Sequence, residues 1–447
     1  MTLPFDAAAL ERIGRAAAED AWRGGMSVRK PDGTVVPIPL VAEPEPFSPE
    51  ELERLAREAR ALLSGAVKLA RALLAHGDAR DREALLGPFE GLEAEAMARL
   101  FDEAPLPALV ARVDFLRPGE PGAPARALEL NATIPAMPAY ADLAAHSWLR
   151  AAARERGLPP RVAEDLVAEC GSNMEEFRRT LAAYHALRGG TRARPAIAIV
   201  ARPGDAQIGE LRRLAEHFRQ MGHRVENLTP ADCRPGEWEL LYRHVWAHNT
   251  PPDSPFAEAL RHPGRFILAN PVNGLLEAKA LFARLSECAD DPALAALAGL
   301  DEEERGAALR IPWTRRLDAG LVPRLLADRK AFVLKRSWDY GGKSVLLGAE
   351  LGEEEWARGV EAALADTRGG GFVVQERIFA AWRPATRITP EGTFAGQLVR
   401  DVSTYAGLGP AWPRGSVVRA AASPIVNILG GGGLAPVIPE PVLARLA

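Results

Sequence analysis

The sequence contains few cysteines, few lysines and no long apolar run. Its three cysteines, Cys170, Cys233 and Cys288, are far apart and form no Cys-x-x-Cys pair, which excludes a disulfide framework and a zinc knuckle. No apolar run approaches the roughly 20 residues that span a bilayer. Lysine accounts for only six of the 55 basic residues. We therefore expect lysine where a compact ammonium group is needed.

Acidic and basic residues nearly balance, with 59 of the first and 55 of the second among 447 residues. A protein that neutralises phosphate backbones would be basic, so we expect no nucleic-acid partner. The N-terminus carries acidic residues where a secretory signal needs a basic start. We expect no membrane partner and a cytoplasmic location, and the oligomeric state stays open. The length predicts two or three lobes.

The hydrophobic pattern of the first half is mainly helical. Ala, Leu, Glu and Arg recur with helical spacing, which predicts a helical N-terminal lobe over 1–105. Two strand-like runs, 109–116 and 126–133, flank a Pro- and Gly-rich turn and predict a hairpin between helices. Together with the helices that follow, this hairpin would form a second part over 106–190.

The second half alternates between strands and helices. Over 191–310 the alternation predicts a small parallel α/β unit. Over 311–447 the pattern is α+β, with antiparallel strands towards the C-terminus. The predicted fold class is therefore mixed α/β and α+β.

A lysine and a Gly-rich turn lie between two predicted strands in VLKRSWDYGGKSVLLG. The segment YGGKS resembles part of a phosphate-binding P-loop, but that motif needs a glycine in place of Ser337 and a helix after the Lys-Ser pair. What remains is a hairpin whose tip can fold over phosphates while Lys335 meets their charge. The alternative is an ordinary β-turn with an exposed lysine.

Charged and polar residues alternate along the hairpin predicted in the first half. Arg112 and Asp114 share one face of its first strand, and Glu129 and Asn131 share one face of its second strand. Two carboxylates and an amide that converge in this way suit Mg²⁺, which prefers oxygen ligands and also binds substrate phosphates. The alternative is a surface hairpin with a polar outer face.

Two further motifs are less specific. Lys279 lies on an amphipathic helix behind FILAN, where a surface lysine is the simpler interpretation. The apolar strand FVVQERI ends in Gln375, Glu376 and Arg377. This strand end could offer backbone groups to a nucleobase, or it could simply be where a strand stops.

Taken together, these segments resemble the ATP-grasp ligases. In an ordinary ATP-grasp chain the lysine strand and the Gly-rich loop precede the metal-binding Asp and Glu-x-Asn, whereas here RVDF and LELNATIP come first. This order resembles the circularly permuted branch that includes the glutathionylspermidine synthetase type. The segments ELLYRHVW, FILANPVNGLLEAK and SPIVNILGGGG are similar to others of that branch. A Pro- and Gly-rich insertion departs from the pattern and puts the register of Asp114 against Glu129 in doubt.

The resemblance implies a nucleotide site. Lys335 and Lys279 would contact the phosphates of ATP, and Gly341 with Gly342 would form the lid. Gln375, Glu376 and the backbone around Arg377 would hold adenine and ribose.

The resemblance also implies the catalytic chemistry. Asp114, Glu129 and Asn131 would bind Mg²⁺, and Arg112 would stabilise an anionic intermediate, with Lys335 as the second catalytic residue. The expected function is an ATP-dependent carboxylate-amine ligase that acts through an acylphosphate on a small amino acid, peptide or polyamine-like substrate. A catalytically inactive nucleotide-binding module of the same fold is the alternative.

Overall fold

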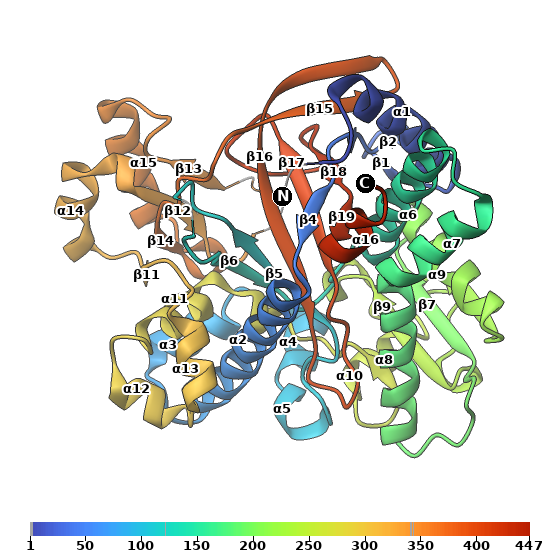
Figure 1. Cartoon of the computed structure of the whole chain (residues 1–447). Coiled ribbons are helices and arrows are strands. Elements are labelled where there is room, and N and C mark those ends of the chain that lie inside the picture. The colour runs from blue at the N-terminus through green and yellow to red at the C-terminus, as the bar shows by residue number, and fades with distance from the viewer. Residues whose placement is uncertain (1–2, 121, 340–341, 343) are drawn as a thin grey trace.

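The computed structural model describes residues 3–447 except 121, 340, 341 and 343. Figure 1 shows a central sheet, a smaller sheet with two helices at one edge of the molecule, and a parallel α/β unit at the opposite edge. Among the described helices, none is both long and apolar enough to cross a membrane. Gly341, which we expect in the lid, lies outside the described residues.

The central sheet has seven strands in the order β15-β3-β18-β17-β16-β5-β6. Neighbouring strands are antiparallel except β3 and β18, which are parallel. The predicted hairpin is confirmed as β5 and β6, at one end of the sheet. The bounds are β3 (Leu40–Val41), β5 (Ala111–Leu116), β6 (Arg126–Asn131), β15 (Arg383–Thr389), β16 (Gly392–Ala406), β17 (Ser416–Ala421) and β18 (Gly433–Ala435).

The first hundred residues contain the predicted helices, but they are not a purely helical lobe. Four short strands lie between α1 and α2, in a segment where prolines recur and cannot continue a helix. One of these strands, β3, lies between β15 and β18, so this segment is part of the central sheet. The other elements are α1 (Ala7–Arg23), β1 (Ser27–Arg29), β2 (Val35–Pro37), β4 (Glu45–Phe47), α2 (Pro49–His76), α3 (Ala79–Leu86), α4 (Gly91–Met97) and α5 (Leu100–Glu103).

The middle of the chain follows the predicted order of elements. Three helices come first, and then four parallel strands in the order β10-β9-β7-β8 confirm a small α/β unit. The bounds are α6 (Pro138–Glu155), α7 (Pro160–Cys170), α8 (Asn173–Leu187), β7 (Ile197–Ala201), α9 (Ile208–Gln220), β8 (Val225–Leu228), β9 (Leu240–His244), α10 (Ala257–Arg261), β10 (Leu268–Ala269), α11 (Lys279–Glu287), α12 (Pro292–Leu297) and α13 (Glu302–Ala308).

The smaller sheet has four antiparallel strands in the order β11-β14-β12-β13. The strand after YGGKS is β13, as the sequence predicts. Trp356 and Leu325, from the two helices on this sheet, are buried against it. The bounds are β11 (Thr314–Arg316), α14 (Val322–Ala327), β12 (Phe332–Arg336), β13 (Val345–Leu347), α15 (Glu353–Ala365) and β14 (Phe372–Glu376), and the chain ends with β19 (Val437–Pro439) and α16 (Glu440–Ala444).

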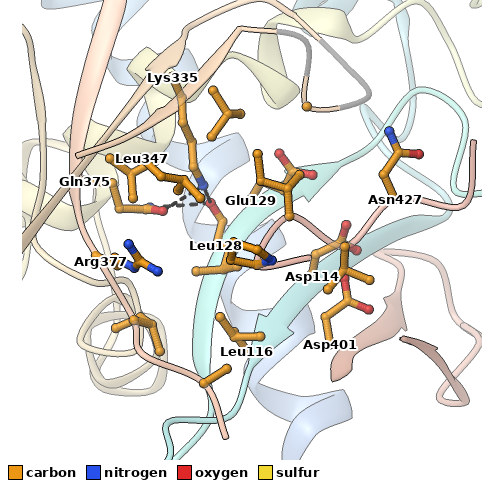
Figure 2. A pocket seen from close by; sticks show the side chains of 18 of the residues that line it. Asp114, Leu116, Leu128, Glu129, Lys335, Leu347, Gln375, Arg377, Asp401 and Asn427 are labelled. Atoms are coloured by element: carbon orange, nitrogen blue, oxygen red, sulfur yellow. Dashed lines mark hydrogen bonds between the residues drawn. The ribbon is translucent and has the colours of Figure 1, made fainter. Parts of the chain in front are cut away.

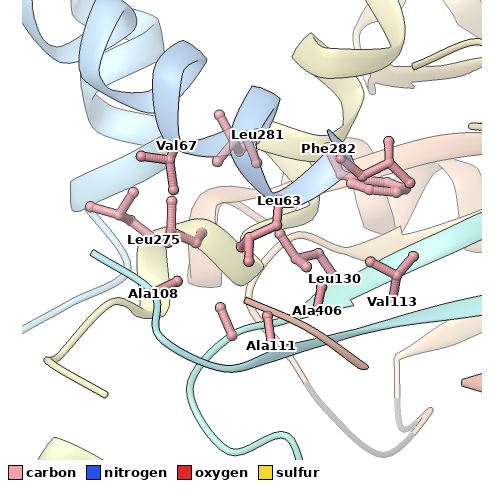
Figure 3. Close-up of a cluster of buried hydrophobic side chains, with 14 of the residues drawn as sticks. Leu63, Val67, Ala108, Ala111, Val113, Leu130, Leu275, Leu281, Phe282 and Ala406 are labelled. Atoms are coloured by element: carbon pink, nitrogen blue, oxygen red, sulfur yellow. The ribbon is translucent and has the colours of Figure 1, made fainter. Parts of the chain in front are cut away.

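A hydrophobic core lies beneath the β5–β6 hairpin. Val113 and Leu130 point into it from the two strands, towards Leu63 of α2 and Phe282 of α11 (Figure 3). Because side chains alternate along a strand, the charged neighbours of Val113 and Leu130 face the opposite side. A slip of one residue would bury those charges in the core, so the core specifies which face is polar.

Asn270 joins the parallel α/β unit to the hairpin. It follows β10 and is only 1% exposed. Its Oδ1 accepts hydrogen bonds from the backbone N–H groups of Leu109 (2.8 Å) and Val110 (3.0 Å). Its Nδ2 donates to the carbonyls of Val110 (2.6 Å) and Ala132 (2.9 Å). One side chain therefore fixes the start of β5 and the segment after β6.

We expect Asn270→Ala to lower the free energy of unfolding by roughly 2–4 kcal/mol, because it removes four hydrogen bonds to buried backbone groups. Urea denaturation of both proteins would measure the loss. Asn249 is exposed, and Asn249→Ala is the matched control with no expected change. Equal stability of Asn270→Ala and wild type would show that this side chain does not hold the hairpin.

Candidate functional site

A cavity of about 480 Å³ lies where the β5–β6 hairpin faces the smaller sheet. Its volume is in the range of small-molecule sites. The sequence predicts a set of site residues, and all of those that the structure describes line this cavity. These residues are Arg112, Asp114, Glu129, Asn131, Lys279, Lys335, Gly342, Gln375, Glu376 and Arg377.

The hairpin keeps the expected register in spite of the insertion. Asp114 lies opposite Glu129, and Arg112 lies opposite Asn131. The pairing shifts immediately afterwards, where Phe115 pairs with Ala127, so the intervening Leu128 is the extra residue of a β-bulge. The insertion therefore leaves the four polar side chains together.

Lys335 is enclosed by protein acceptors. Its Nζ donates to Oε1 of Gln375 at 2.7 Å and lies 3.5 Å from the carbonyl oxygen of Leu128, the bulge residue (Figure 2). Burial lowers the pKa of the Lys335 ammonium to about 8, although Glu129 favours the charged form. The site therefore keeps this cation in a place where water solvates it poorly.

Lys279 is a cavity residue and not a surface lysine. Its side chain is 12% exposed, and its Nζ donates to the carbonyl of Asp339 at 2.9 Å. Oε2 of Glu129 lies 3.6 Å from the same ammonium. Lys279 begins α11, so a helix from another part of the chain supplies a second cation to the cavity.

Four buried charges form one network at the central sheet. Arg112 donates to both carboxylate oxygens of Asp114, at 2.8 and 3.1 Å. Arg419 donates to Oδ2 of Asp114 at 2.8 Å and through Nε to both oxygens of Asp401 at 3.1 Å. Burial raises the pKa of Asp114, but the charges of Arg112 and Arg419 outweigh it and hold this pKa well below its usual value. Two cations and two anions thus balance one another.

The sequence reasoning missed Asp401 and Arg419, which lie on β16 and β17 and line the same cavity. Figure 2 shows the carboxylates of Asp401 and Asp114 next to one another. A signal was present, because each is a charge in a mainly apolar strand, and such a charge needs a partner when it faces inward. The identity of that partner depends on strand order, which the local pattern does not contain.

The residues predicted to hold adenine already bind other parts of the protein. Nε2 of Gln375 donates to Oγ1 of Thr314 at 3.0 Å, while its Oε1 accepts from Lys335. The backbone N–H groups of Glu376 and Arg377 donate to carbonyls of neighbouring segments at 2.8 and 2.7 Å. The amide of Gln375 is therefore oriented towards the lysine, and a role in binding adenine stays a prediction.

The predicted Mg²⁺ ligands fit a cation to different degrees. Asp114 already accepts three hydrogen bonds, so about one of its four acceptor positions is left. The Glu129 side chain is 34% exposed, and the buried Nδ2 of Asn131 has no hydrogen-bond partner in the described structure. Rotation of that amide would present its oxygen instead. Glu129 and Asn131 are therefore better placed than Asp114 to bind a cation. Among the described residues, no three or more His, Cys, Asp or Glu side chains form a metal cluster.

Comparison with known proteins supports the fold. No family model and no curated sequence matches this chain. A glutathione synthetase-like effector (GSS30) from Globodera pallida, solved in its apo form, matches with a TM-score of 0.64 and 12% identity over 98% of this chain and 100% of that one. A candidate gamma-glutamylcysteine synthetase from Methylobacillus flagellatus has a TM-score of 0.38 and 12% identity, over 76% and 83% of the two chains. The first match establishes a shared fold along the whole chain.

We expect Lys335→Met to raise the free energy of unfolding by about 1–2 kcal/mol at pH 7, because relief of the poorly solvated charge outweighs the loss of the hydrogen bond to Gln375. The pKa of Lys335 in the folded protein, about 8, is below its usual 10.5. The penalty is therefore complete below pH 8 and disappears as the pH rises towards 10.5. Chemical denaturation between pH 7 and 10 should show the gap between variant and wild type closing.

Lys330, which is exposed, supplies the control for this experiment. Lys330→Met should leave stability unchanged throughout the pH range. A Lys335→Met protein that is no more stable than wild type at pH 7, or a gap that does not depend on pH, would contradict the account of Lys335.

Proposed function

We propose that this protein is an ATP-dependent ligase that joins a carboxylate to an amine. The observation that carries this proposal is the convergence of Lys279 and Lys335 on the same cavity as Glu129 and Asn131. Two cations and a pair of oxygen ligands are the groups that a nucleotide triphosphate and its metal ion require. They come from three separate parts of the chain, so their meeting is a property of the fold.

The two lysines would bind the phosphates. Lys335 on β12 and Lys279 at the start of α11 approach the cavity from different elements. A phosphate bound next to Lys335 would supply a negative charge that stabilises the buried ammonium. Gly342, with a φ of 72°, lines the same cavity within the Gly-rich turn. Glycine at position 342 suits close approach of the backbone to phosphate, since glycine adopts that conformation without strain.

Glu129 and Asn131 would hold Mg²⁺, with Asp114 supplying one further oxygen at most. When bound, the ion would neutralise charge on the phosphates during transfer. The protein's own contribution is positional, because the β5–β6 register and the apolar core below it hold both ligands on one face.

Arg112 and Arg419 would act on the substrate carboxylate. The network fixes both guanidinium groups, and Nη1 of Arg419 has no partner among the described residues. In the proposed reaction the carboxylate attacks the γ-phosphate to give an acylphosphate and ADP, and an amine then displaces phosphate. Prearranged cations would stabilise the charge that develops in each step.

The shared fold with a glutathione synthetase-like protein supports this proposal, as does the motif order. In this chain the hairpin with Asp114, Glu129 and Asn131 precedes the strand of Lys335, which is the order of the circularly permuted ATP-grasp branch. A small amino acid, peptide or polyamine-like molecule is the proposed substrate class.

We expect ATP or ADP with Mg²⁺ to raise the melting temperature, because a ligand that binds only the native state stabilises it by about 2.7 kcal/mol at 100 times its Kd. Lys335→Met should lose most of this shift, whereas Lys330→Met should retain it. Differential scanning fluorimetry measures both. A full shift in folded Lys335→Met protein would place the nucleotide elsewhere.

We expect Glu129→Gln to reduce kcat by 10²-fold or more, because it removes a charge from the metal site while preserving size and hydrogen bonding. ADP binding and thermal stability should change little. ADP release in the presence of mixed amino acids and polyamines, measured by mass spectrometry and a coupled assay, tests this expectation. Unchanged turnover in Glu129→Gln would remove Glu129 from the metal site.

The alternative is a nucleotide-binding interaction module without ligase activity. The presence of both lysines and of the predicted metal ligands in one cavity favours an enzyme, since a module that only binds nucleotide does not need all of them. Nucleotide binding without ADP release from wild type, with any acceptor in the pool, would favour the module.

A further inference from the structure

Lys335 lies at the end of a hydrogen-bond chain that crosses three neighbouring strands of the smaller sheet. Thr314 on β11 pairs with Gln375 on β14, and β14 in turn pairs with β12, which carries Lys335. Oγ1 of Thr314 donates to the carbonyl of Pro312 at 2.6 Å. Nε2 of Gln375 donates to Oγ1 at 3.0 Å, and Oε1 of Gln375 accepts from Lys335 at 2.7 Å.

The hydroxyl of Thr314 sets the direction of this chain. A hydroxyl has one proton, and the Pro312 carbonyl can only accept it. Oγ1 must therefore act as an acceptor towards Gln375, which turns Nε2 to the threonine and Oε1 to the lysine. The carbonyl of Leu128, 3.4 Å from Nε2, favours the same orientation. If the amide turned by half a rotation, it would point N–H groups at an ammonium.

Burial makes this orientation energetically important. Thr314 is 1% exposed and Gln375 is 2% exposed, so water cannot replace a lost partner. A buried polar group without a partner costs roughly 1–3 kcal/mol, and more when the group is charged. Lys335 has two protein acceptors in the described structure, and Gln375 is much the closer of them.

We propose that Thr314 is a positioning residue that, through Gln375, holds the ammonium of Lys335 towards the cavity. Its consequence for nucleotide binding rests on the proposed function, whereas its effect on Lys335 does not. Neither residue needs to touch a ligand for this role. This role also explains why Thr314 and Gln375 are polar in a sheet whose other side is packed with apolar residues.

The test compares Thr314→Val, which removes the hydroxyl at nearly constant volume, with Thr314→Ser, which retains it. Thr180→Val is the matched control, because Thr180 is also fully buried and its hydroxyl donates within α8, to the carbonyl of Glu176. The first readout is the rate of acetylation of Lys335 by trace acetic anhydride, relative to exposed Lys30, by peptide mass spectrometry. Only six lysines are present, so each can be followed separately.

We expect Thr314→Val to raise the relative acetylation rate of Lys335 several-fold. Without the threonine hydroxyl, the amide of Gln375 can turn its Oε1 away from Lys335, and an ammonium without its acceptor loses its proton more readily. Thr314→Ser and Thr180→Val should stay within about twofold of wild type. Gln375→Met, which removes the acceptor directly, should have the same effect as Thr314→Val and serves if the latter does not fold. An unchanged rate for Lys335 in a folded Thr314→Val or Gln375→Met protein would overturn the proposal.

The second readout is the affinity for ADP. We expect Thr314→Val to raise its Kd on the order of tenfold, with Thr314→Ser restoring the wild-type value. If wild type binds no nucleotide, the proposed function fails while the acetylation result still decides the role of Thr314. If wild type binds ADP and Thr314→Val binds it equally well, the positioning role is refuted and the proposed function stands.

Discussion

The site depends on the requirement that charges buried in the central sheet be paired. Strands β5, β16 and β17 bring together Arg112, Asp114, Asp401 and Arg419. The attraction between their opposite charges offsets the cost of burying them. Removal of one partner would leave an uncompensated charge in a poorly solvated place, which typically costs several kcal/mol. The network therefore holds these strands in one register. Glu129 and Asn131 inherit their positions from it, because β6 pairs with β5.

In the smaller sheet, the buried ammonium of Lys335 is hydrogen-bonded, among the described residues, to neutral polar groups and not to a counter-ion. Lys335 is bound by an amide and lies near a backbone carbonyl, and its pKa is low because burial disfavours the charged ammonium more than the nearby carboxylate of Glu129 favours it. This arrangement costs stability in the absence of an anion. In the proposed function this arrangement would leave the ammonium available to a phosphate, whereas a carboxylate partner would compete with one. The bulge at Leu128 connects the two sheets, since its carbonyl reaches Lys335 from the hairpin.

The sequence predicted the local elements well where one face of an element is apolar. The β5–β6 hairpin, the parallel α/β unit and the strand after the Gly-rich turn were found by period and turn residues alone. The short strands between α1 and α2 were missed, because strands as short as β3 carry too little alternation to be recognised. Their stability comes from neighbours distant in the sequence, such as β15 and β18.

The sequence by itself predicted polar residues that line the cavity and the face of each strand that they occupy. Arg112 with Asp114, and Glu129 with Asn131, are two positions apart on strands, and a period of two places each pair on one side. Only the tertiary structure decided how these residues are used. In the folded protein Asp114 forms ion pairs with two arginines, and Gln375 accepts a hydrogen bond from Lys335. Asp401 and Arg419, from strands late in the chain, complete the charge network. Such partners are chosen by strand order and burial, which bring together side chains hundreds of residues apart and which no local pattern encodes.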